Sequence, residues 1–202
     1  MSFIVWNILD LLEKYGEENV DILLSGFSTK TIRNGEQTDL NPDIENFLKK
    51  NAIQFAKEKK SVTYLVCDRN TGLLLGYFTL THKSIEIPPD GLSKTKLRTL
   101  EKFSRYHEKL NAYTVSAFLI AQFGKNYQVD NGNRITGSDL MQLVDQELFE
   151  LQHRVGGGLK YLDCEADAHL INFYQKQQNF ILYGERISER DGKRYLQFLK
   201  FF

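Results

Sequence analysis

The chain has 202 residues, of which 42% are apolar and 12% aromatic, which is enough for one sizeable hydrophobic core and argues against disorder. Lysine and arginine together number 26, as do aspartate and glutamate, so the formal net charge is zero and a uniformly basic nucleic-acid binder is excluded. A basic patch on one part of the surface stays compatible with this balance.

The first third of the chain is predicted to contain two helices, a strand and a polar stretch. Apolar residues recur at helical spacing over residues 3–15, which predicts a helix. Residues 20–24 form a short apolar run typical of a strand, and residues 25–40 are polar and rich in turn formers. At Asn41-Pro42 a side-chain acceptor precedes a proline, a pair typical of the first turn of a helix, so a helix should begin there.

The middle of the chain is predicted to form a hairpin, a helix and a long strand. Residues 62–67 and 73–80 are apolar or β-branched, and the turn formers between them predict a β-hairpin. Residues 94–110 have apolar side chains at helical spacing, which predicts a helix. Residues 114–123 form a long apolar run, as expected of a buried strand.

The last third begins with a 14-residue loop at residues 124–137, and loops of that length usually have a function. A helix is expected over residues 138–155, ended by three glycines that tolerate the left-handed conformation of a helix terminus. The remaining predicted elements are a strand at 161–166, a helix at 168–178 and two strands at 181–187 and 195–202. This order predicts an α/β fold with a central mixed β-sheet and helices on both faces.

Two sequence features concern the compartment of the protein. No apolar run approaches the roughly 18 residues of a membrane-spanning helix, and the N-terminus shows no secretory signal. Cys67 and Cys164 each lie in an apolar, strand-like run, which suits a reducing compartment better than a disulfide scaffold. The sequence therefore predicts a cytoplasmic protein that does not bind a membrane.

The order of elements resembles the GNAT family of acetyl-CoA-dependent N-acetyltransferases from about residue 20 onward. The second and third GNAT strands are matched by VTYLVCDRNTGLLLGYFTL, with the typical glycine–aromatic pair at Gly76-Tyr77. The central strand, the pyrophosphate loop and its helix are matched by AFLIAQFGKNY and ITGSDLMQLV. The late helix of the family is matched by DAHLINFYQKQQNF.

The resemblance implies a single GNAT-like acetyltransferase domain over residues 1–202. Within it, residues 1–19 are expected to be an N-terminal helical extension and residues 88–112 a helical insertion. The segments FLKKNAIQFAKEKKSVTYLV and GYFTLTHKSIEI are also similar to the tRNA-acetylating toxins of this family. That narrower likeness rests on apolar patterns and implies aminoacyl-tRNA as one candidate acceptor.

A phosphate cradle is implied at the loop and the helix that follows it. A helix N-terminus presents free backbone N–H groups and the positive end of the helix dipole to an anion such as the pyrophosphate of acetyl-CoA. The residues in this position are Asn133, Arg134, Ile135, Thr136, Gly137 and Ser138. Gly137 fits the family spacing, but Ile135 stands where the first glycine belongs. An ordinary strand–helix connection is the alternative.

The end of the long strand is the implied site of the thioester. In the family, backbone N–H groups there polarise the acetyl carbonyl, as an oxyanion hole does. By position these groups belong to Phe123, Gly124 and Lys125, and Gly124 suits a place where backbone approaches a ligand closely. The alternative is that the glycine simply ends the strand.

Tyr174 matches the position of the general acid that protonates the departing CoA thiolate in many members of the family. The alternative is a core aromatic, because Leu170, Phe173 and Tyr174 share one helix face. Asn179 replaces a family glycine, and asparagine tolerates the same left-handed conformation.

His82 and Glu86 are candidate bases for the incoming amine, although each also suits an ordinary surface position. The other three histidines lack the spacing of a zinc site, so no metal is expected.

The charges are segregated along the chain. Residues 1–48 carry nine acids and three bases, whereas residues 49–60 carry five lysines and one acid. The predicted helix over residues 94–109 carries six lysines and arginines against two glutamates. If the two basic stretches meet around the acceptor, an anionic acceptor such as aminoacyl-tRNA is favoured. The alternative is two solvated helix faces.

The leading hypothesis is an N-acetyltransferase that moves acetyl from the co-substrate acetyl-CoA to a primary amine by direct attack. The acceptor would be the amine of a small molecule or a peptide. One alternative is a tRNA-directed acetyltransferase of toxin type. Another is a degenerate, non-catalytic domain that binds CoA weakly or serves as an interaction module. A homodimer through sheet edges is common among the proteins that the chain resembles.

Overall fold

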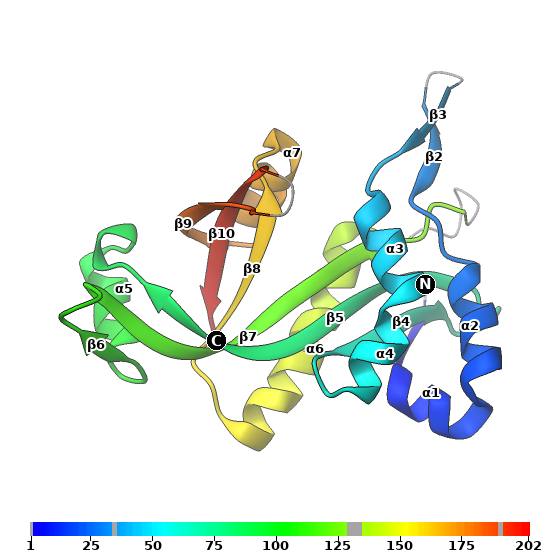
Figure 1. The fold of residues 1–202 in the computed structure, drawn as a ribbon, viewed down its shortest axis with the longest axis horizontal. Helices are drawn as coiled ribbons and strands as arrows, with labels where there is room; N and C mark the ends of the chain where they lie inside the picture. The colour runs from blue at the N-terminus through cyan, green and yellow to red at the C-terminus, as the bar shows by residue number, and fades with distance from the viewer. Residues whose placement is uncertain (1, 34–35, 129–134, 190–191) are drawn as a thin grey trace. The chain divides into compact units, whose positions relative to one another are not determined.

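The computed structural model describes residues 2–33, 36–128, 135–189 and 192–202 (Figure 1). Its residues form two compact units. Unit 1 comprises Met1–Thr81 and Ala121–Val144, and unit 2 comprises His82–Ile120 and Asp145–Phe202. Three long elements contribute residues to both units, namely β5 (Leu74–Ile87), β7 (Ala112–Lys125) and α6 (Gly137–Val155).

Among the described residues, eight strands form one mixed sheet with the hydrogen-bonded order β1-β4-β5-β7-β8-β10-β9, and β6 pairs with β7. All pairs with a described register are antiparallel except β7 with β8. β2 and β3 form a separate hairpin. The predicted α/β class with a mixed sheet is confirmed. No helix in the described part of the chain combines the length and the apolar character needed to cross a bilayer.

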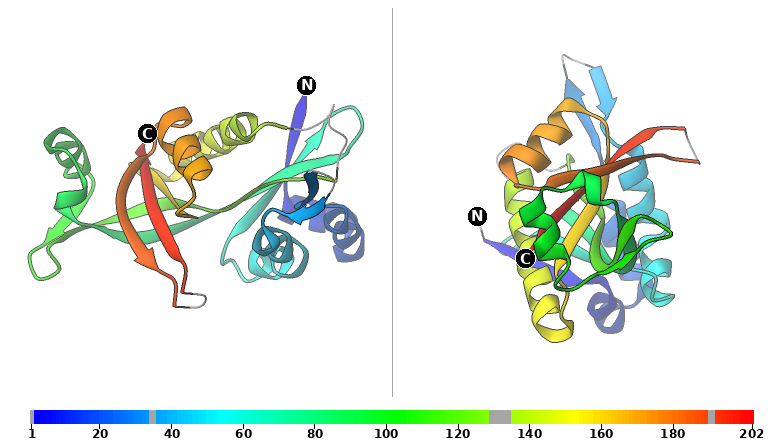
Figure 2. Two further views of the ribbon diagram at one scale, coloured as in Figure 1. Left: turned by 90° about the horizontal axis from the view of Figure 1, so that it is seen from above. Right: turned by 90° about the vertical axis from the view of Figure 1, so that its left-hand side faces the viewer.

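Unit 1 packs helices on both faces of its strands (Figures 1 and 2). Besides the shared elements it holds β1 (Phe3–Asn7), α1 (Ile8–Tyr15), α2 (Glu17–Ser25), β2 (Lys30–Arg33), β3 (Glu36–Asp39), α3 (Pro42–Lys50), α4 (Ala52–Lys57) and β4 (Val62–Asp68). Tyr77 of β5 lies in one core with Leu65 of β4 and the apolar faces of α1 to α4. A Cβ built on the neighbouring residue, Gly76, would point to the opposite face of the sheet, toward Leu140 of α6.

Unit 2 contains a second core around the early part of β7. Its own elements are η1 (Pro89–Gly91), α5 (Lys94–Leu100), β6 (Arg105–His107), β8 (Leu159–Glu165), α7 (Ala168–Ile171), the π-helical turn η3 (Asn172–Gln177), β9 (Ile181–Ile187) and β10 (Arg194–Phe201). The parallel pairing of β7 with β8 joins Phe118 to Lys160 and Leu119 to Tyr161. Leu100 of α5 packs with Val115, Tyr161 and other buried residues of the strands.

Two predicted local signals are confirmed. The helix start at Asn41-Pro42 is α3, and the Asn41 Oδ1 accepts a hydrogen bond from the Ile44 backbone N–H at 3.4 Å. The predicted hairpin is β4–β5, in which Val62 pairs with Leu80. Both cysteines are buried and free, as their apolar neighbours indicated.

The predicted helix over residues 3–15 is wrong in its first part. Residues Phe3–Asn7 form β1, an outer strand that pairs with β4, and α1 begins only at Ile8. The Asn7 Oδ1 accepts a hydrogen bond from the Leu9 N–H at 2.9 Å and so caps α1. Ile4 and Trp6 are both partly buried against the unit 1 core, which is the alternate spacing of a strand.

The predicted strand over residues 20–24 is a helix instead, α2. Val20 and Leu24 are buried, whereas Ile22 is 70% exposed. Buried residues four apart with an exposed residue between them fit a helix, and the short run was too brief to distinguish the two periods. Within the polar stretch 25–40, the structure places the β2–β3 hairpin.

The predicted helix over residues 94–110 ends at Leu100. Arg105–His107 form β6, in which Tyr106 pairs with Tyr113 of β7 across a turn at Asn111, whose φ is +47°. The region 88–112 therefore combines a short helix with a strand, and its basic residues do not lie on one helix.

A carboxylate at the start of α3 anchors the segment that leads into the β2–β3 hairpin. Glu45 Oε2 accepts hydrogen bonds from the Thr29 backbone N–H at 2.8 Å and from the Ser28 hydroxyl at 3.1 Å, and Glu45 Oε1 lies 2.7 Å from Lys49 Nζ. The Thr29 hydroxyl donates to Asp39 Oδ1 at 2.6 Å. Burial raises the pKa of Glu45, but the hydrogen bonds from Lys49, Thr29 and Ser28 outweigh it and lower this pKa to about 2.

Glu45→Gln should therefore reduce stability in a pH-dependent way. The folded-state pKa lies below the ordinary value of 4.5, so the ionised carboxylate stabilises the fold above pH 4.5 and loses that effect as the pH falls toward 2. We expect wild type to exceed Glu45→Gln by about 2–3 kcal/mol at pH 7, and the difference to shrink below pH 4.5 in urea unfolding. A pH-independent difference, equal to that of the exposed control Glu13→Gln, would contradict this assignment.

Candidate functional site

The end of β7 carries Phe123, Gly124 and Lys125, the three residues expected to offer backbone N–H groups. Gly124 lies inside the strand, which extends to Lys125, so the glycine does not itself end β7. A Cβ built on Gly124 would lie 2.5 Å from Ile44 Cγ2 and 3.4 Å from atoms of Phe27 and Tyr77. The glycine is thus required by the close approach of α3 to the sheet, and it places these three residues directly beneath the start of that helix.

Asn126 follows the strand and was not singled out from the sequence. Its side chain is buried and makes four hydrogen bonds. Oδ1 accepts from the backbone N–H groups of Ser28 at 2.9 Å and Gln128 at 3.0 Å. Nδ2 donates to the carbonyl oxygens of Gly26 at 2.9 Å and Leu74 at 2.8 Å. A polar residue after an apolar strand is too common a pattern to have predicted this network.

The start of α6 holds the described part of the predicted cradle. Thr136 Oγ1 accepts a hydrogen bond from the Asp139 N–H at 3.1 Å, and Asp139 Oδ2 accepts from the Thr136 N–H at 3.0 Å. This reciprocal pair is a capping box. Gly137 and Ser138 form the first turn behind it. Asn133 and Arg134 lie outside the described residues.

Ile135, which stands where the family has a glycine, is a core residue. Its side chain is buried, and a Cβ built on Gly76 would lie 3.6 Å from Ile135 Cγ2 and 3.5 Å from Leu140 Cδ2. The glycine that the family usually places in the loop is replaced here by an apolar residue, which lies over Gly76 of β5 at ordinary contact distance. Ile135 is therefore held by packing in the core.

Tyr174 lies in the π-helical turn η3 of unit 2, where its ring is buried. Ring centroids of Phe173, Phe180 and Phe198 lie 5.0, 5.9 and 5.9 Å away. Burial, with a smaller contribution from Cys164, raises the pKa of the Tyr174 phenol well above its ordinary value, so the hydroxyl keeps its proton at neutral pH. Among the described residues this hydroxyl has no hydrogen-bond partner.

The turn after Tyr174 explains the family departure at Asn179. Asn179 has a φ of +58°, the left-handed conformation that the family glycine would adopt, as expected for asparagine. The Phe180 N–H donates to the Tyr174 carbonyl at 2.9 Å and closes this turn. π-helical turns are rare and frequently occur at functional sites.

Of the two candidate bases, His82 contacts other side chains in unit 2. Its ring packs against Phe118 with a centroid distance of 5.0 Å, and its nitrogens lie 3.3 and 3.4 Å from the Ser116 hydroxyl. His82 and Glu86 are both exposed. In the part of the chain that the structure describes, no group of three or more His, Cys, Asp or Glu side chains could hold a metal ion.

A buried ion pair, also missed from the sequence, fixes α6 to the start of β8. Lys160 is 4% exposed, and its Nζ lies 2.6 Å from Asp145 Oδ1. Lys200 Nζ lies 3.6 Å from the other oxygen of Asp145. Burial lowers the pKa of Lys160, and the hydrogen bond to Asp145 opposes this effect. The pair lies beside the short parallel contact of β8 with β7.

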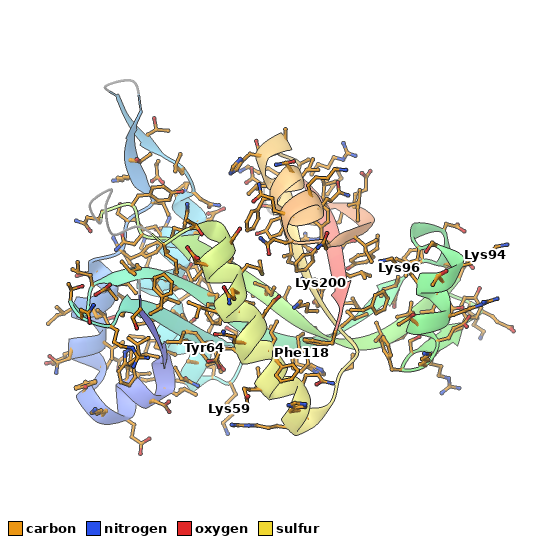
Figure 3. All side chains as sticks on the ribbon, turned by 180° about the vertical axis from the view of Figure 1, so that it is seen from behind. Lys59, Tyr64, Lys94, Lys96, Phe118 and Lys200 are labelled. Atoms are coloured by element: carbon orange, nitrogen blue, oxygen red, sulfur yellow. The ribbon has the colours of Figure 1, made fainter. Side chains whose placement is uncertain are left out.

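The two basic stretches differ in their ion pairing. In unit 1, Lys49 pairs with Glu45, Lys57 with Glu17 and Lys60 with Glu58. In unit 2, none of the six bases over 94–109 forms an ion pair with another described residue; they are Lys94, Lys96, Arg98, Lys102, Arg105 and Lys109. Figure 3 shows Lys94 and Lys96 on α5. Ion pairs thus involve three of the five lysines in the first stretch and none of the six bases in the described second stretch.

No protein-family model and no curated protein matches the sequence. Solved structures do match. A tyrosine-to-phenylalanine mutant of KacT is 15% identical with a TM-score of 0.61, and AtaT complexed with acetyl-methionyl-tRNAfMet is 15% identical with a TM-score of 0.60. Each match covers 96% of this chain and 94% of the other. The NatC complex bound to Gag peptide and CoA is 11% identical, with a TM-score of 0.52 over 100% of this chain and 99% of the other.

These structures share one architecture with the chain over nearly its whole length. The mixed sheet, with α6 on one face and α1 to α4 on the other in unit 1, is the fold of the GNAT acetyltransferases. The chain therefore has the GNAT fold, which confirms the resemblance noted in its sequence. Among its neighbours are bacterial toxins as well as a peptide-binding complex.

Gly124→Ala should destabilise the protein by roughly 1–3 kcal/mol, the usual cost of overpacking a core. The added methyl would lie 2.5 Å from Ile44 Cγ2. Because Ile44→Ala removes that methyl, the double variant should be more stable than the sum of the two single effects predicts. Gly26→Ala is the control, since its added methyl would make an ordinary 3.4 Å contact. Strict additivity in a urea-unfolding cycle would contradict the packing explanation.

Proposed function

We propose that the protein is an N-acetyltransferase that transfers acetyl from acetyl-CoA to a primary amine. The observation that carries this proposal is the strand–loop–helix segment from β7 to α6 in a GNAT fold that covers nearly the whole chain. A CoA-bound neighbour, the NatC complex, supports acetyl-CoA as the co-substrate.

In this proposal the start of α6 binds the pyrophosphate of acetyl-CoA. The backbone N–H groups of the first helical turn and the positive end of the helix dipole favour an anion there. The described residues of the cradle are Ile135, Thr136, Gly137 and Ser138, and the other two residues predicted for it, Asn133 and Arg134, lie outside the described part of the chain. Since Ile135 is anchored beneath α6, the cradle keeps its position without the family glycine.

The thioester is proposed to lie along the end of β7, with its carbonyl oxygen accepting from backbone N–H groups of Phe123–Lys125. The amine nitrogen attacks the carbonyl carbon, and the C–N bond forms as the C–S bond breaks. The amine loses one proton to solvent. The CoA thiolate takes its proton from a general acid that is then restored from water. Tyr174 is our candidate for this acid because it matches the family position and its hydroxyl has no hydrogen-bond partner among the described residues.

Tyr174→Phe should lower kcat for CoA release by roughly 100- to 10,000-fold, the usual contribution of a general acid. Acetyl-CoA affinity and folding should change little, because the described hydroxyl makes no hydrogen bond. Tyr183→Phe is the matched control, since Tyr183 is also buried in unit 2. An undiminished rate of thiol release would exclude the acid role.

The measurement of thiol release uses polyamines, aminoglycosides, peptides and aminoacyl-tRNA as acceptors. Calorimetry with acetyl-CoA alone tests the proposal independently of the acceptor. A protein that shows no heat of binding at millimolar acetyl-CoA would not be an acetyltransferase. Such a protein would instead be the degenerate interaction domain considered above.

The second candidate function is acetylation of an aminoacyl-tRNA, and one observation favours it. The six bases over residues 94–109 have no ion pair within the described chain, and an anionic polymer would neutralise them. The exposed rings of Phe103 and Tyr106 lie in the same stretch and are suited to stacking on unpaired bases. The neighbour AtaT is itself seen with acetyl-methionyl-tRNAfMet.

Reversing three charges on α5, with Lys94→Glu, Lys96→Glu and Arg98→Glu together, should weaken tRNA binding at least tenfold at low salt. The plot of log K against log salt should also become shallower by roughly 0.7–0.9 for each phosphate that the variant no longer neutralises. The matched control reverses Lys50, Lys57 and Lys59 in unit 1. Both triple variants should still acetylate small amines. Equal tRNA affinity and an equal salt slope in the two variants would exclude α5 as the docking surface.

A further inference from the structure

The Asn126 side chain uses its entire hydrogen-bonding capacity. Asn126 is 3% exposed. Its two amide hydrogens donate to two carbonyl oxygens, and its side-chain oxygen accepts hydrogen bonds from two backbone N–H groups. Its own backbone N–H donates to the Leu75 carbonyl at 2.8 Å. A buried amide satisfied on every side fixes its surroundings, because any displacement leaves several polar groups unpaired.

The partners of Asn126 come from three parts of unit 1. Leu74 and Leu75 belong to the start of β5, Gly26 and Ser28 to the segment after α2, and Gln128 to the loop beyond β7. The Tyr127 N–H adds a bond to the Ser28 carbonyl at 2.8 Å. Asn126 thus joins the end of β7 to the neighbouring strand and to the chain that leads into the β2–β3 hairpin.

The strand end next to Asn126 is restrained from two sides. On one side Gly124 lies against Ile44 of α3, and Tyr77 supports that contact by donating its hydroxyl to the Ile44 carbonyl at 2.6 Å. On the other side Asn126 anchors the residue after Lys125. Strand ends fray readily when they lack such restraints, and catalytic groups must be held to within about 0.5 Å of their working positions.

We propose that Asn126 is a positioning residue for acetyl transfer, which holds the backbone N–H groups of Phe123–Lys125 in line with the thioester carbonyl. This inference rests on the proposed function and adds a residue that does not touch the substrate. The two halves of the amide have separate tasks. Nδ2 ties the strand end to β5 and to Gly26, whereas Oδ1 orders Ser28 and the first residues of the loop.

Asn126→Asp is the sharpest variant because it keeps the shape of the side chain. Its second oxygen would face the carbonyl oxygens of Gly26 and Leu74, so those two bonds are replaced by repulsion. Asn126→Ala removes both halves, and Asn126→Ser is the milder substitute if alanine does not fold. Asn19→Ala is the matched control: Asn19 is an asparagine of the same unit whose side chain donates to the Tyr15 carbonyl at 2.8 Å.

Each variant is compared by kcat, by KM for acetyl-CoA and by the folded fraction from urea unfolding. We expect the Asn126 variants to lose at least tenfold in kcat, with KM for acetyl-CoA within threefold of wild type. Asn19→Ala should keep kcat within twofold when corrected for its folded fraction. If the corrected kcat of the Asn126 variants also stays within twofold of wild type, the positioning role is overturned.

Amide hydrogen exchange gives a readout that does not depend on activity. In Asn126→Asp, exchange over residues 123–126 should rise at least tenfold while β4 stays protected, and Asn19→Ala should leave both segments unchanged. A wild type without acetyl-CoA turnover would refute the proposed function. In that case the exchange result decides whether Asn126 holds the end of β7, and unchanged exchange would overturn that role too.

Discussion

Two adjacent strands of unit 1 each carry a glycine where no side chain fits, and the arrangement of the site depends on that constraint. At Gly76 of β5 a Cβ would lie 2.9 Å from the Gly124 carbonyl oxygen, so this glycine lets β5 and β7 lie close together. At Gly124 of β7 a Cβ would lie 2.5 Å from Ile44 Cγ2, so this glycine leaves room for α3. The absence of two methyl groups thus allows the close approach of β7 to β5 and of α3 to β7. Asn126 fixes the residue that follows the end of β7.

The sequence predicted those parts of the fold that depend on local chemistry. The α3 start at Asn41, the β4–β5 hairpin and the left-handed Asn179 all follow from turn and cap preferences, which act within a few residues. The errors occurred where tertiary pairing decides. Residues 3–7 form a strand because β4 offers them an edge, and Arg105–His107 form one because β7 does. Neither partner could be read from the segment itself.

The residues of the candidate site also fall into those that the sequence predicted and those that depend on distant parts of the chain. Tyr174 was predicted as a site residue from its place in a late helix, and the structure adds that this segment is a π-helical turn in which the ring is buried. Asn126 and the Lys160–Asp145 pair could not be predicted, because each depends on residues far away in the chain. Charge counts gave two basic stretches, and only the structure reveals that acids such as Glu17 and Glu45 form ion pairs with lysines of the first.

The capping box at the start of α6 affects the free energy that an anionic ligand could gain by binding at that helix. Thr136 and Asp139 already satisfy each other in the free protein. An anion that approaches this turn finds the backbone N–H groups of Thr136 and Asp139 already hydrogen-bonded. It also comes close to the Asp139 carboxylate, which has the same sign of charge. The carboxylate opposes the attraction of the helix dipole for an anion, so binding there would bring a smaller net gain than at an uncapped helix. The helix itself keeps its first turn in the free protein without needing a ligand to hold it.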